Sequence, residues 1–469
     1  MDMNSVLSYV GLVLMITGIF GLTPVIVSGV FSDGLYWLFL FMSLVCFITG
    51  FLLDRSFKKS DINLNSAMFI SLLSFIAISL FGSIPYMSYL NPLDAIFESV
   101  SGFTTTGMSV IKNPENMPPS ILFWRSMTQW IGGVGIIIIS ILLLNSPGLS
   151  SYYLYRAEGK GERIEASVRS SVRKIFFIYL TYTFLGILLF SVAGMPLFES
   201  VLNTFTAVST GGFTTRSGSI GSYGNPFIEI VAIILMIIGA TSFFIHARLW
   251  DRNIKGYVKN PEVRFFWGLV VVFSGLLTIT FIGMPDSFRA GLFQTFSALT
   301  TTGFSILTTK PGETAQMLMI ILMVIGGCAG STAGGIKLIR SGVVLKSLSW
   351  IGKKLSLPEE AVVPFKFGDK TIKSNELTII LIFTFIYFGV ILLSSLVLMM
   401  LGYSSLESVF MSASAEGTVG LSVIEPSSLH PLGKIVLMLN MLLGRLEILP
   451  FVTVGYVLYT EFVKRKQVI

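Results

Sequence analysis

The sequence predicts an all-α membrane protein with about ten transmembrane helices. Its 469 residues are 53% hydrophobic and 12% charged, whereas soluble domains carry about 25% charged residues. Ten apolar stretches are long enough to cross a bilayer core of about 30 Å. In four of the gaps between them, a short apolar segment ends in a turn rich in threonine and glycine. We therefore expect an N-terminal hairpin of two helices followed by four similar repeats.

Each repeat is expected to contain a span, a short re-entrant helix, the Thr/Gly turn and a second span. Two spans separate successive turns, so the four repeats run parallel. The expected spans are 6–30, 34–53, 65–86, 123–144, 174–194, 226–247, 264–283, 313–336, 376–401 and 431–460. The expected domains are the hairpin 1–62 and the repeats 63–150, 170–250, 262–345 and 372–464.

The four turns share a register. A threonine stands two residues before the last glycine of every turn. Glycine tolerates positive φ angles, and threonine offers a carbonyl and a hydroxyl oxygen. Four such loops can close a ring, and a ring of backbone carbonyls can replace the water around a potassium ion. The turns are Thr104-Thr105-Thr106-Gly107, Ser209-Thr210-Gly211-Gly212, Thr300-Thr301-Thr302-Gly303 and Gly417-Thr418-Val419-Gly420.

Close packing between membrane helices also uses small residues, and it is the alternative explanation for any one of these turns. Four turns in register, in the same kind of gap, favour four pore loops around a central pore. Non-helical backbone at membrane depth is tolerated only where it is buried in protein or lines water. We therefore expect the residues of the four turns to bind potassium as a selectivity filter.

An acidic residue precedes the last glycine by thirteen positions in three repeats. These residues are Asp94, Glu199 and Glu407, and Ala290 takes the place in the third repeat. A carboxylate at the start of the re-entrant helix complements the positive end of the helix dipole. We prefer this capping role, and direct attraction of cations is the alternative.

The distribution of Lys and Arg predicts the orientation. Most of the 32 basic residues fall in loops on the side of the N-terminus, which the positive-inside rule places in the cytoplasm. All four turns then enter from outside, and both termini are cytoplasmic. The net charge of +7 needs no nucleic-acid partner, because anionic lipid or a partner protein would meet it. The outer side holds Lys112, Arg125, Arg216, Arg289, Lys310 and Lys434.

The eighth span is interrupted by glycines at 326–335, in the sequence Gly326-Gly327-Cys328-Ala329-Gly330-Ser331-Thr332-Ala333-Gly334-Gly335. Each interior glycine costs a helix about 1 kcal/mol relative to alanine, so we expect a break in the helix beneath the third turn. Close helix packing is the alternative. A phosphate-binding loop is less consistent, because the spacing to Lys337 is too long and no strand precedes it.

Several motifs carry a resemblance to a known family. The chain resembles the Trk/Ktr/HKT superfamily of potassium transporters, most closely its TrkH branch of ion-conducting subunits. The N-terminal hairpin also looks like TrkH. The motifs are Gly102-Phe103-Thr104-Thr105-Thr106-Gly107, Trp130-Ile131-Gly132-Gly133-Val134-Gly135, Ala298-Leu299-Thr300-Thr301-Thr302-Gly303-Phe304, Gly330-Ser331-Thr332-Ala333-Gly334-Gly335-Ile336-Lys337 and Gly444-Arg445-Leu446-Glu447.

This resemblance implies that the glycine-rich segment is a gate, an intramembrane loop that blocks the path below the filter. Its residues would be Gly326, Gly327, Gly330, Ser331, Thr332, Gly334 and Gly335, with Lys337 at the inner rim. Glycine at the end of all four turns implies a preference for potassium, since some sodium-permeable plant relatives carry serine in the first turn.

Arg445 and Glu98 are the two charged residues with expected roles near the filter. A charge inside a span is costly and functional by default, and Arg445 matches the family's pore-region arginine. It would hydrogen-bond the gate loop or limit ion occupancy, and the alternative is a structural ion pair with Glu447 or Glu416. Glu98 is expected to support the filter backbone by hydrogen bonds.

The resemblance implies potassium uptake by a homodimer with one pore in each subunit. It also implies a cytoplasmic regulatory subunit of the TrkA type that binds NAD(H) or ATP, because this chain has no dinucleotide fingerprint of its own. The basic loops 156–174 and 337–373 are the expected docking surfaces. The protein would lie in the cell membrane, inner or plasma, as a multi-pass protein, with K⁺ as its transported ion.

Other classes are less consistent with the residues. An enzyme would need a catalytic pair or a metal site, and the isolated Cys46, Cys328, His246 and His430 supply neither. A coupled transporter built from inverted repeats conflicts with the parallel repeats. A sodium-permeable pore, or a symporter of the same fold coupled to H⁺ or Na⁺, remains the alternative function.

Overall fold

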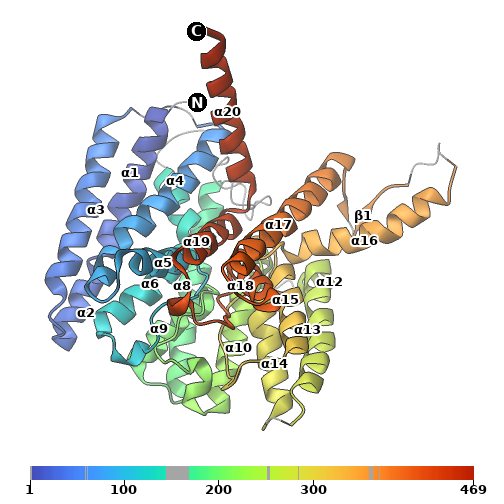
Figure 1. The fold of residues 1–469 in the computed structure, drawn as a ribbon, viewed down its shortest axis with the longest axis horizontal. Helices are drawn as coiled ribbons and strands as arrows, with labels where there is room; N and C mark the ends of the chain where they lie inside the picture. Colours follow the sequence, from blue (N-terminus) through green and yellow to red (C-terminus); the bar gives the residue numbers. More distant parts are fainter. Residues whose placement is uncertain are drawn as a thin grey trace.

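The computed structural model describes residues 3–58, 60, 62–143, 168–250, 254–283, 285–358, 363–368 and 370–468. Within these residues the chain is helical apart from loops and one small hairpin, β1 (Lys366–Phe367) and β2 (Lys370–Thr371). The helices gather into a bundle, from which α20 (Leu449–Val468) and α16 (Leu338–Leu355) project (Figure 1). Four short 3₁₀ helices connect them: η1 (Ile84–Ser88), η2 (Pro114–Asn116), η3 (Ser219–Tyr223) and η4 (Pro426–Ser428).

The N-terminal hairpin consists of α1 (Met3–Phe20), α2 (Thr23–Phe31) and α3 (Tyr36–Ser56). Its two long helices cross at a pair of glycines. A Cβ atom at Gly11 would lie 2.5 Å from the Gly50 carbonyl oxygen, and a Cβ atom at Gly50 would lie 2.5 Å from the Gly11 carbonyl oxygen. The absence of side chains at both positions lets the two backbones touch.

Four further units follow, in each of which a helix of 12 or 13 residues comes after a longer one. Repeat 1 holds α4 (Leu64–Gly82), α5 (Pro92–Phe103) and α6 (Pro119–Leu143), and repeat 2 holds α8 (Val168–Val192), α9 (Leu197–Val208), α10 (Pro226–Ala240) and α11 (Phe243–Trp250). Repeat 3 follows α12 (Ile254–Lys259) and holds α13 (Pro261–Thr280), α14 (Ser287–Leu299), α15 (Glu313–Ile325) and α16. Repeat 4 holds α17 (Ser374–Met400), α18 (Ser405–Glu416), α19 (Pro431–Leu446) and α20.

Six helices of the described residues are long and apolar enough to cross a membrane, and two bent helix pairs bring the number to eight. The expected span 226–247 is such a pair, since α10 and α11 meet at 103°. The expected span 431–460 is another, bent by 102° where α19 ends and α20 begins. Two more expected spans, 123–144 and 313–336, correspond to α6 and to α15, which stops at Ile325.

The bend after α10 has a tertiary cause. The last carbonyls of a helix lack donors within the helix, and here the loop after α15 provides them. The Cys328 N–H donates to the Ala240 carbonyl at 2.9 Å, and the Thr332 N–H donates to the Gly239 carbonyl at 3.2 Å. These bonds end α10 against the loop, so the chain turns away into α11.

Candidate functional site

The four Thr/Gly turns close a ring through their glycines. A Cβ atom at Gly107 would lie 1.9 Å from the Gly211 carbonyl oxygen of repeat 2. A Cβ atom at Gly212 would lie 1.9 Å from the Thr302 carbonyl oxygen, and one at Gly303 would lie 1.9 Å from the Val419 carbonyl oxygen. A Cβ atom at Gly420 would lie 2.1 Å from the Thr106 carbonyl oxygen. Each final glycine thus touches the next repeat's carbonyl, and the fourth returns to the first.

All four turns have the same backbone shape. The threonine two residues before the last glycine has a positive φ in every repeat, at 56° for Thr105, 52° for Thr210, 53° for Thr301 and 48° for Thr418. The last glycines have φ between 77° and 84°. Positive φ is rare for β-branched residues and costs of order 1 kcal/mol or more. The surrounding structure must therefore hold each threonine in place.

The end of each short helix supplies part of that hold. The N–H of the residue before the last glycine donates to the carbonyl five residues earlier in every repeat. These bonds run from Thr106 to Ser101 at 2.9 Å, Gly211 to Thr206 at 2.7 Å, Thr302 to Ser297 at 3.1 Å and Val419 to Ser414 at 2.8 Å. The helix and its turn therefore form one hydrogen-bonded unit, repeated four times.

The chain is non-helical from Gly326 to Lys337, between α15 and α16. This segment, the inner loop, folds back on itself at glycines. A Cβ atom at Gly326 would lie 2.2 Å from the Gly334 carbonyl oxygen, and Gly326, Gly330 and Gly335 all have φ between 70° and 78°. Ser331 donates to the Cys328 carbonyl at 2.6 Å and tightens the bend between them. Only glycine fits these close, left-handed positions without strain.

The inner loop lies directly against the ring. In repeat 3 the Gly334 N–H donates to the Thr301 hydroxyl at 2.7 Å. In repeat 2 the Thr210 hydroxyl donates to the Thr332 hydroxyl at 3.2 Å. In repeat 4 a Cβ atom at Gly334 would lie 2.2 Å from the Thr418 hydroxyl oxygen. The loop therefore meets the threonine side chains of three repeats.

Arg445 completes this contact at repeat 1. Its Nη1 donates to the Thr105 hydroxyl at 3.1 Å and to the Thr332 carbonyl at 2.8 Å, and its Nη2 donates to the Gly132 carbonyl at 2.6 Å. The guanidinium thus joins the first turn to the inner loop. Lys337 turns back into the loop and donates to the Ala333 carbonyl.

The two acids considered as partners of Arg445 have different surroundings. Glu447 forms an ion pair with Arg340 at 2.5 Å. Glu416 is fully buried at the end of α18, and neither of its carboxyl oxygens has a hydrogen-bond partner among the described residues. The carbonyl of Thr332 in the inner loop is a direct hydrogen-bond partner of Arg445, at 2.8 Å.

Glu98 is fully buried and supports the segment that follows the first turn. It accepts from the Val110 N–H at 2.9 Å and from the Ser109 hydroxyl at 2.9 Å. Arg125 pairs with it at 2.8 Å and also donates to the Thr214 carbonyl of repeat 2 at 3.1 Å. The sequence analysis places Arg125 only among the basic residues of the outer side. Its position at the start of an apolar span is the signal that could have predicted this role.

Gln129 is a second contact that the sequence analysis missed. Its Nε2 donates to the Gly211 carbonyl at 2.7 Å, and its Oε1 accepts from the Phe213 N–H at 3.1 Å. A Cβ atom at Gly211 would lie 2.4 Å from the Gln129 carboxamide. This explains why repeat 2 has glycine where the other turns have threonine or valine.

The acids at the start of the short helices are held in ion pairs. Asp94 pairs with Lys434 at 2.6 Å, Glu199 with Arg216 at 3.0 Å, and Glu407 with Lys310. Each acid lies in the first turn of its helix, as the capping role requires. In repeat 3, Arg289 pairs with Glu229 of repeat 2 at 3.2 Å. Each of the three carboxylates is therefore both at the start of a short helix and in an ion pair.

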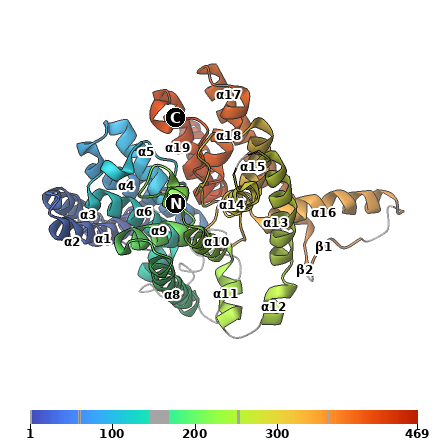
Figure 2. The same cartoon turned by 90° about the horizontal axis from the view of Figure 1, so that it is seen from below.

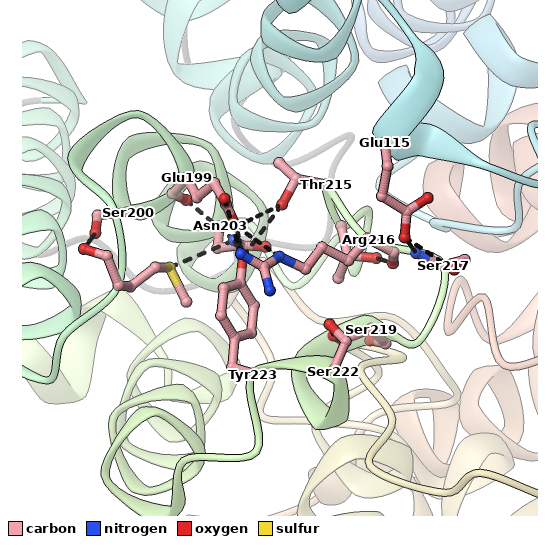
Figure 3. Close-up of polar contacts among 12 residues, drawn as sticks. Glu115, Glu199, Ser200, Asn203, Thr215, Arg216, Ser217, Ser219, Ser222 and Tyr223 are labelled. Carbon is pink, nitrogen blue, oxygen red and sulfur yellow. Dashed lines mark hydrogen bonds and ion pairs between the residues drawn. The ribbon is translucent and has the colours of Figure 1, made fainter.

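Figure 3 shows the most extensive of these clusters, where Glu199 faces Arg216, Thr215 and Tyr223. The Arg216 guanidinium also lies 4.1 Å from the centre of the Tyr223 ring. Burial alone would raise the pKa of the Glu199 carboxyl, but hydrogen bonds from Arg216 and Tyr223 hold it below its ordinary value of 4.5. The cluster therefore remains ionised and ties the chain after the second turn to α9.

An open cavity of about 460 Å³ lies over the ring on the side away from the inner loop. The last glycines of all four turns line it. Among the residues that the structure describes, no group of three or more His, Cys, Asp or Glu side chains could hold a metal ion. The oxygen atoms of the four turns are the candidate cation ligands that the sequence predicts.

Fold and site together define a helical multi-pass membrane protein in which four Thr/Gly turns meet in a ring. The model of the TrkH family, described as a cation transport protein, matches residues 38–461. The chain belongs to this family, and the expectation of a TrkH-like transporter is confirmed. Family membership also confirms that the protein is a transporter rather than an enzyme.

Individual relatives extend over almost the whole chain. An uncharacterized cation transporter of Methanocaldococcus jannaschii is 36% identical over 98% of this chain and 96% of its own length. A Trk system potassium uptake protein TrkH of Halomonas elongata is 30% identical over 99% of this chain and 100% of its own. The crystal structure of the potassium transporter TrkH from Vibrio parahaemolyticus superimposes with a TM-score of 0.87 at 27% identity, covering 97% of this chain and 98% of that one.

Proposed function

We propose that this chain takes up potassium through the ring of four Thr/Gly turns, which acts as a selectivity filter. The ring closure through Gly107, Gly212, Gly303 and Gly420 is the observation that carries this proposal. Carbonyl and hydroxyl oxygens of the turns replace the hydration shell of the ion. The relatives named as potassium uptake proteins support the choice of ion.

The inner loop acts as the gate. In the described conformation it meets the threonine side chains of repeats 2, 3 and 4, and Arg445 joins it to repeat 1. An ion leaving the ring toward the loop would have to displace it. Glycines give the loop its fold and lower the cost of changing it.

A cytoplasmic partner of the TrkA type, binding NAD(H) or ATP, moves the gate, and the transporter works as a homodimer. The basic segments 156–174 and 337–373 are the proposed docking surfaces, of which 156–167, 359–362 and 369 lie outside the described residues. The protein lies in the cell membrane with both termini in the cytoplasm, where its basic loops face anionic lipid. No nucleic acid takes part.

Rubidium uptake into liposomes that hold the purified chain alone tests this proposal. We expect slow uptake with the gate closed, competition by potassium, and little competition by sodium. Equal competition by sodium would favour the sodium-permeable alternative. Uptake that requires a proton or sodium gradient would favour the symporter.

A further inference from the structure

A second cavity, of about 600 Å³, lies where α13, α16 and the β1–β2 hairpin meet. Figure 2 shows the hairpin beside α16, with α13 and α12 next to it. Three basic side chains line the cavity, Lys259 and Arg264 from the α12–α13 side and Lys346 from α16. We call this cavity the α13–α16 pocket.

Close backbone contacts build its walls. A Cβ atom at Gly342 on α16 would lie 2.6 Å from the Phe367 ring, so the hairpin packs directly on that helix. On the other side, a Cβ atom at Gly368 would lie 2.9 Å from the Pro261 side chain. The hairpin therefore bridges the two helices, and the pocket is a defined part of the fold.

The three cations have no acidic partner in the part of the chain that the structure describes. Arg264 donates a hydrogen bond from its Nε to the backbone carbonyl of Val258 at 3.1 Å. All three side chains are exposed, so they are open to a ligand from outside. A group of unpaired cations around one cavity attracts an anion, and a phosphate matches the donors of Arg and Lys.

The surroundings favour a phosphate that carries acyl chains. The exposed apolar side chains on α16 recur every three or four residues and form one stripe. Lys353 and Lys354 lie between them in the sequence, so the helix combines apolar and basic faces. Such helices lie at the surface of anionic membranes. The stripe consists of Leu345, Leu348, Ile351 and Leu355, which are between 44% and 81% exposed.

The two helices that wall the pocket, α13 and α16, both connect to the inner loop. The α16 helix begins at Leu338, directly after the loop. On the α13 side, the Glu262 carboxylate accepts from the Ala329 N–H of the loop at 3.3 Å. A ligand held by Arg264 and Lys346 together would fix the distance between these flanks.

We propose that the α13–α16 pocket binds the phosphate of an anionic phospholipid and thereby holds α16 against α13. The lipid-binding part of this proposal depends only on the residues of the α13–α16 pocket. Its effect on the inner loop rests on the proposed function, because it treats that loop as the gate.

Lipid binding to the purified full-length chain tests the first part. Phosphatidylglycerol in mixed micelles should raise the melting temperature of the wild type, and phosphatidylcholine should not. The double variant Arg264→Gln, Lys346→Gln should bind phosphatidylglycerol more weakly, by a factor of roughly ten or more. The matched control Arg55→Gln, Lys58→Gln also removes one Arg and one Lys, at the end of α3 and outside the pocket, and should respond like the wild type.

Equal responses of the pocket variant and the control would overturn the site. A shift with inorganic phosphate alone, equal to that with phosphatidylglycerol, would replace the lipid by a soluble phosphate. Rubidium uptake in liposomes tests the second part, and its dependence on phosphatidylglycerol should disappear in the pocket variant only. Because the melting assay needs no transport, loss of lipid binding is distinguishable from failure of the proposed potassium uptake.

Discussion

At the scale of the residue, threonine in a left-handed conformation is the most unusual feature of the ring. Thr105, Thr210, Thr301 and Thr418 all have positive φ, although glycine would adopt this backbone at lower cost. The hydroxyls of Thr105, Thr210 and Thr301 hydrogen-bond to the inner loop or to Arg445. The side chain therefore has a purpose that glycine could not serve, which is contact between the turn and the loop.

Gly107→Ser tests the ring. A side chain here would collide with the Gly211 carbonyl at 1.9 Å and would have to adopt a φ of 84°, so the first two repeats must separate. We expect the preference for potassium over sodium to fall about tenfold or more, alone or combined with Thr105→Val, because a wider ring replaces the hydration shell poorly. Competition of sodium with rubidium uptake measures this.

The control is Gly389→Ser, the same substitution in α17, where a Cβ atom has no neighbour within 4 Å. It should transport like the wild type. Unchanged ion preference in Gly107→Ser would contradict the assignment of the ring as the filter.

The Glu98–Arg125 pair lends itself to a stability measurement. Their side chains are 0% and 3% exposed, and removing one member of a buried pair leaves the other charge unpaired, at a cost of about 3–5 kcal/mol. Glu98→Gln should therefore lower the melting temperature markedly. Lys112→Gln breaks the exposed pair with Glu425 and should cost less than about 1 kcal/mol. Similar losses of stability in both variants would show that the buried Glu98–Arg125 pair contributes no more to stability than the exposed pair.

At the scale of the element, the inner loop is a break in a helix that fits beneath four turns. Gly334 is its tightest point, because a Cβ atom there would lie 2.2 Å from both the Gly417 carbonyl and the Thr418 hydroxyl. The loop cannot seat against repeat 4 with any side chain at this position.

Gly334→Ala should consequently increase basal rubidium uptake by the chain alone, several-fold over the wild type, since a displaced loop leaves the path open. Gly352→Ala, in α16 with no neighbour within 4 Å, should leave basal uptake unchanged. If Gly334→Ala folds with the melting temperature of the wild type and stays closed, the inner loop is not the gate.

The elements that sequence reasoning identified are those with local signals. Apolar length located the spans, and glycine content located the non-helical stretch 326–337. The bends after α10 and α19 have no such signal. At Ala240 the cause is a hydrogen bond from Cys328, far along the chain. The contacts of Gln129 likewise depend on which face of α6 meets repeat 2, which a single sequence does not specify.

At the scale of the whole molecule, polar contacts connect each repeat to its neighbours. Arg125 reaches repeat 2, Arg289 and Glu229 join repeats 2 and 3, and Lys310 and Glu407 join repeats 3 and 4. Lys434 and Asp94 join repeat 4 to repeat 1. A charged side chain thus joins every repeat to the next, through three ion pairs and one hydrogen bond to a backbone carbonyl.

Two of the ion pairs at the starts of the short helices, Glu407–Lys310 and Glu199–Arg216, predict a dependence on pH. Hydrogen bonds from Lys310 and Ser404 hold the pKa of Glu407 below its ordinary value of 4.5, and Arg216 and Tyr223 do the same for Glu199. A lowered pKa in the folded state contributes stability above about pH 4.5, and this is lost as the pH falls further. The melting temperature should therefore drop below pH 4.5. The free energy of unfolding should fall by less than about 1 kcal/mol for each partly exposed pair.

Glu199→Gln should melt lower than the wild type at pH 7 and show a smaller further drop in acid. An identical pH profile for the variant and the wild type would mean that this carboxylate contributes nothing to the effect.

The return of the fourth turn to the first has a consequence for biosynthesis. Asp94 meets Lys434, and Thr105 meets Arg445, each across 340 residues of sequence. Chains are made from the N-terminus, and contacts so distant in sequence form late. A nascent chain that has inserted three repeats therefore has only an open arc of carbonyls. On the proposed function, the filter is complete only once the last repeat is in place, so an unfinished chain would not conduct potassium through it.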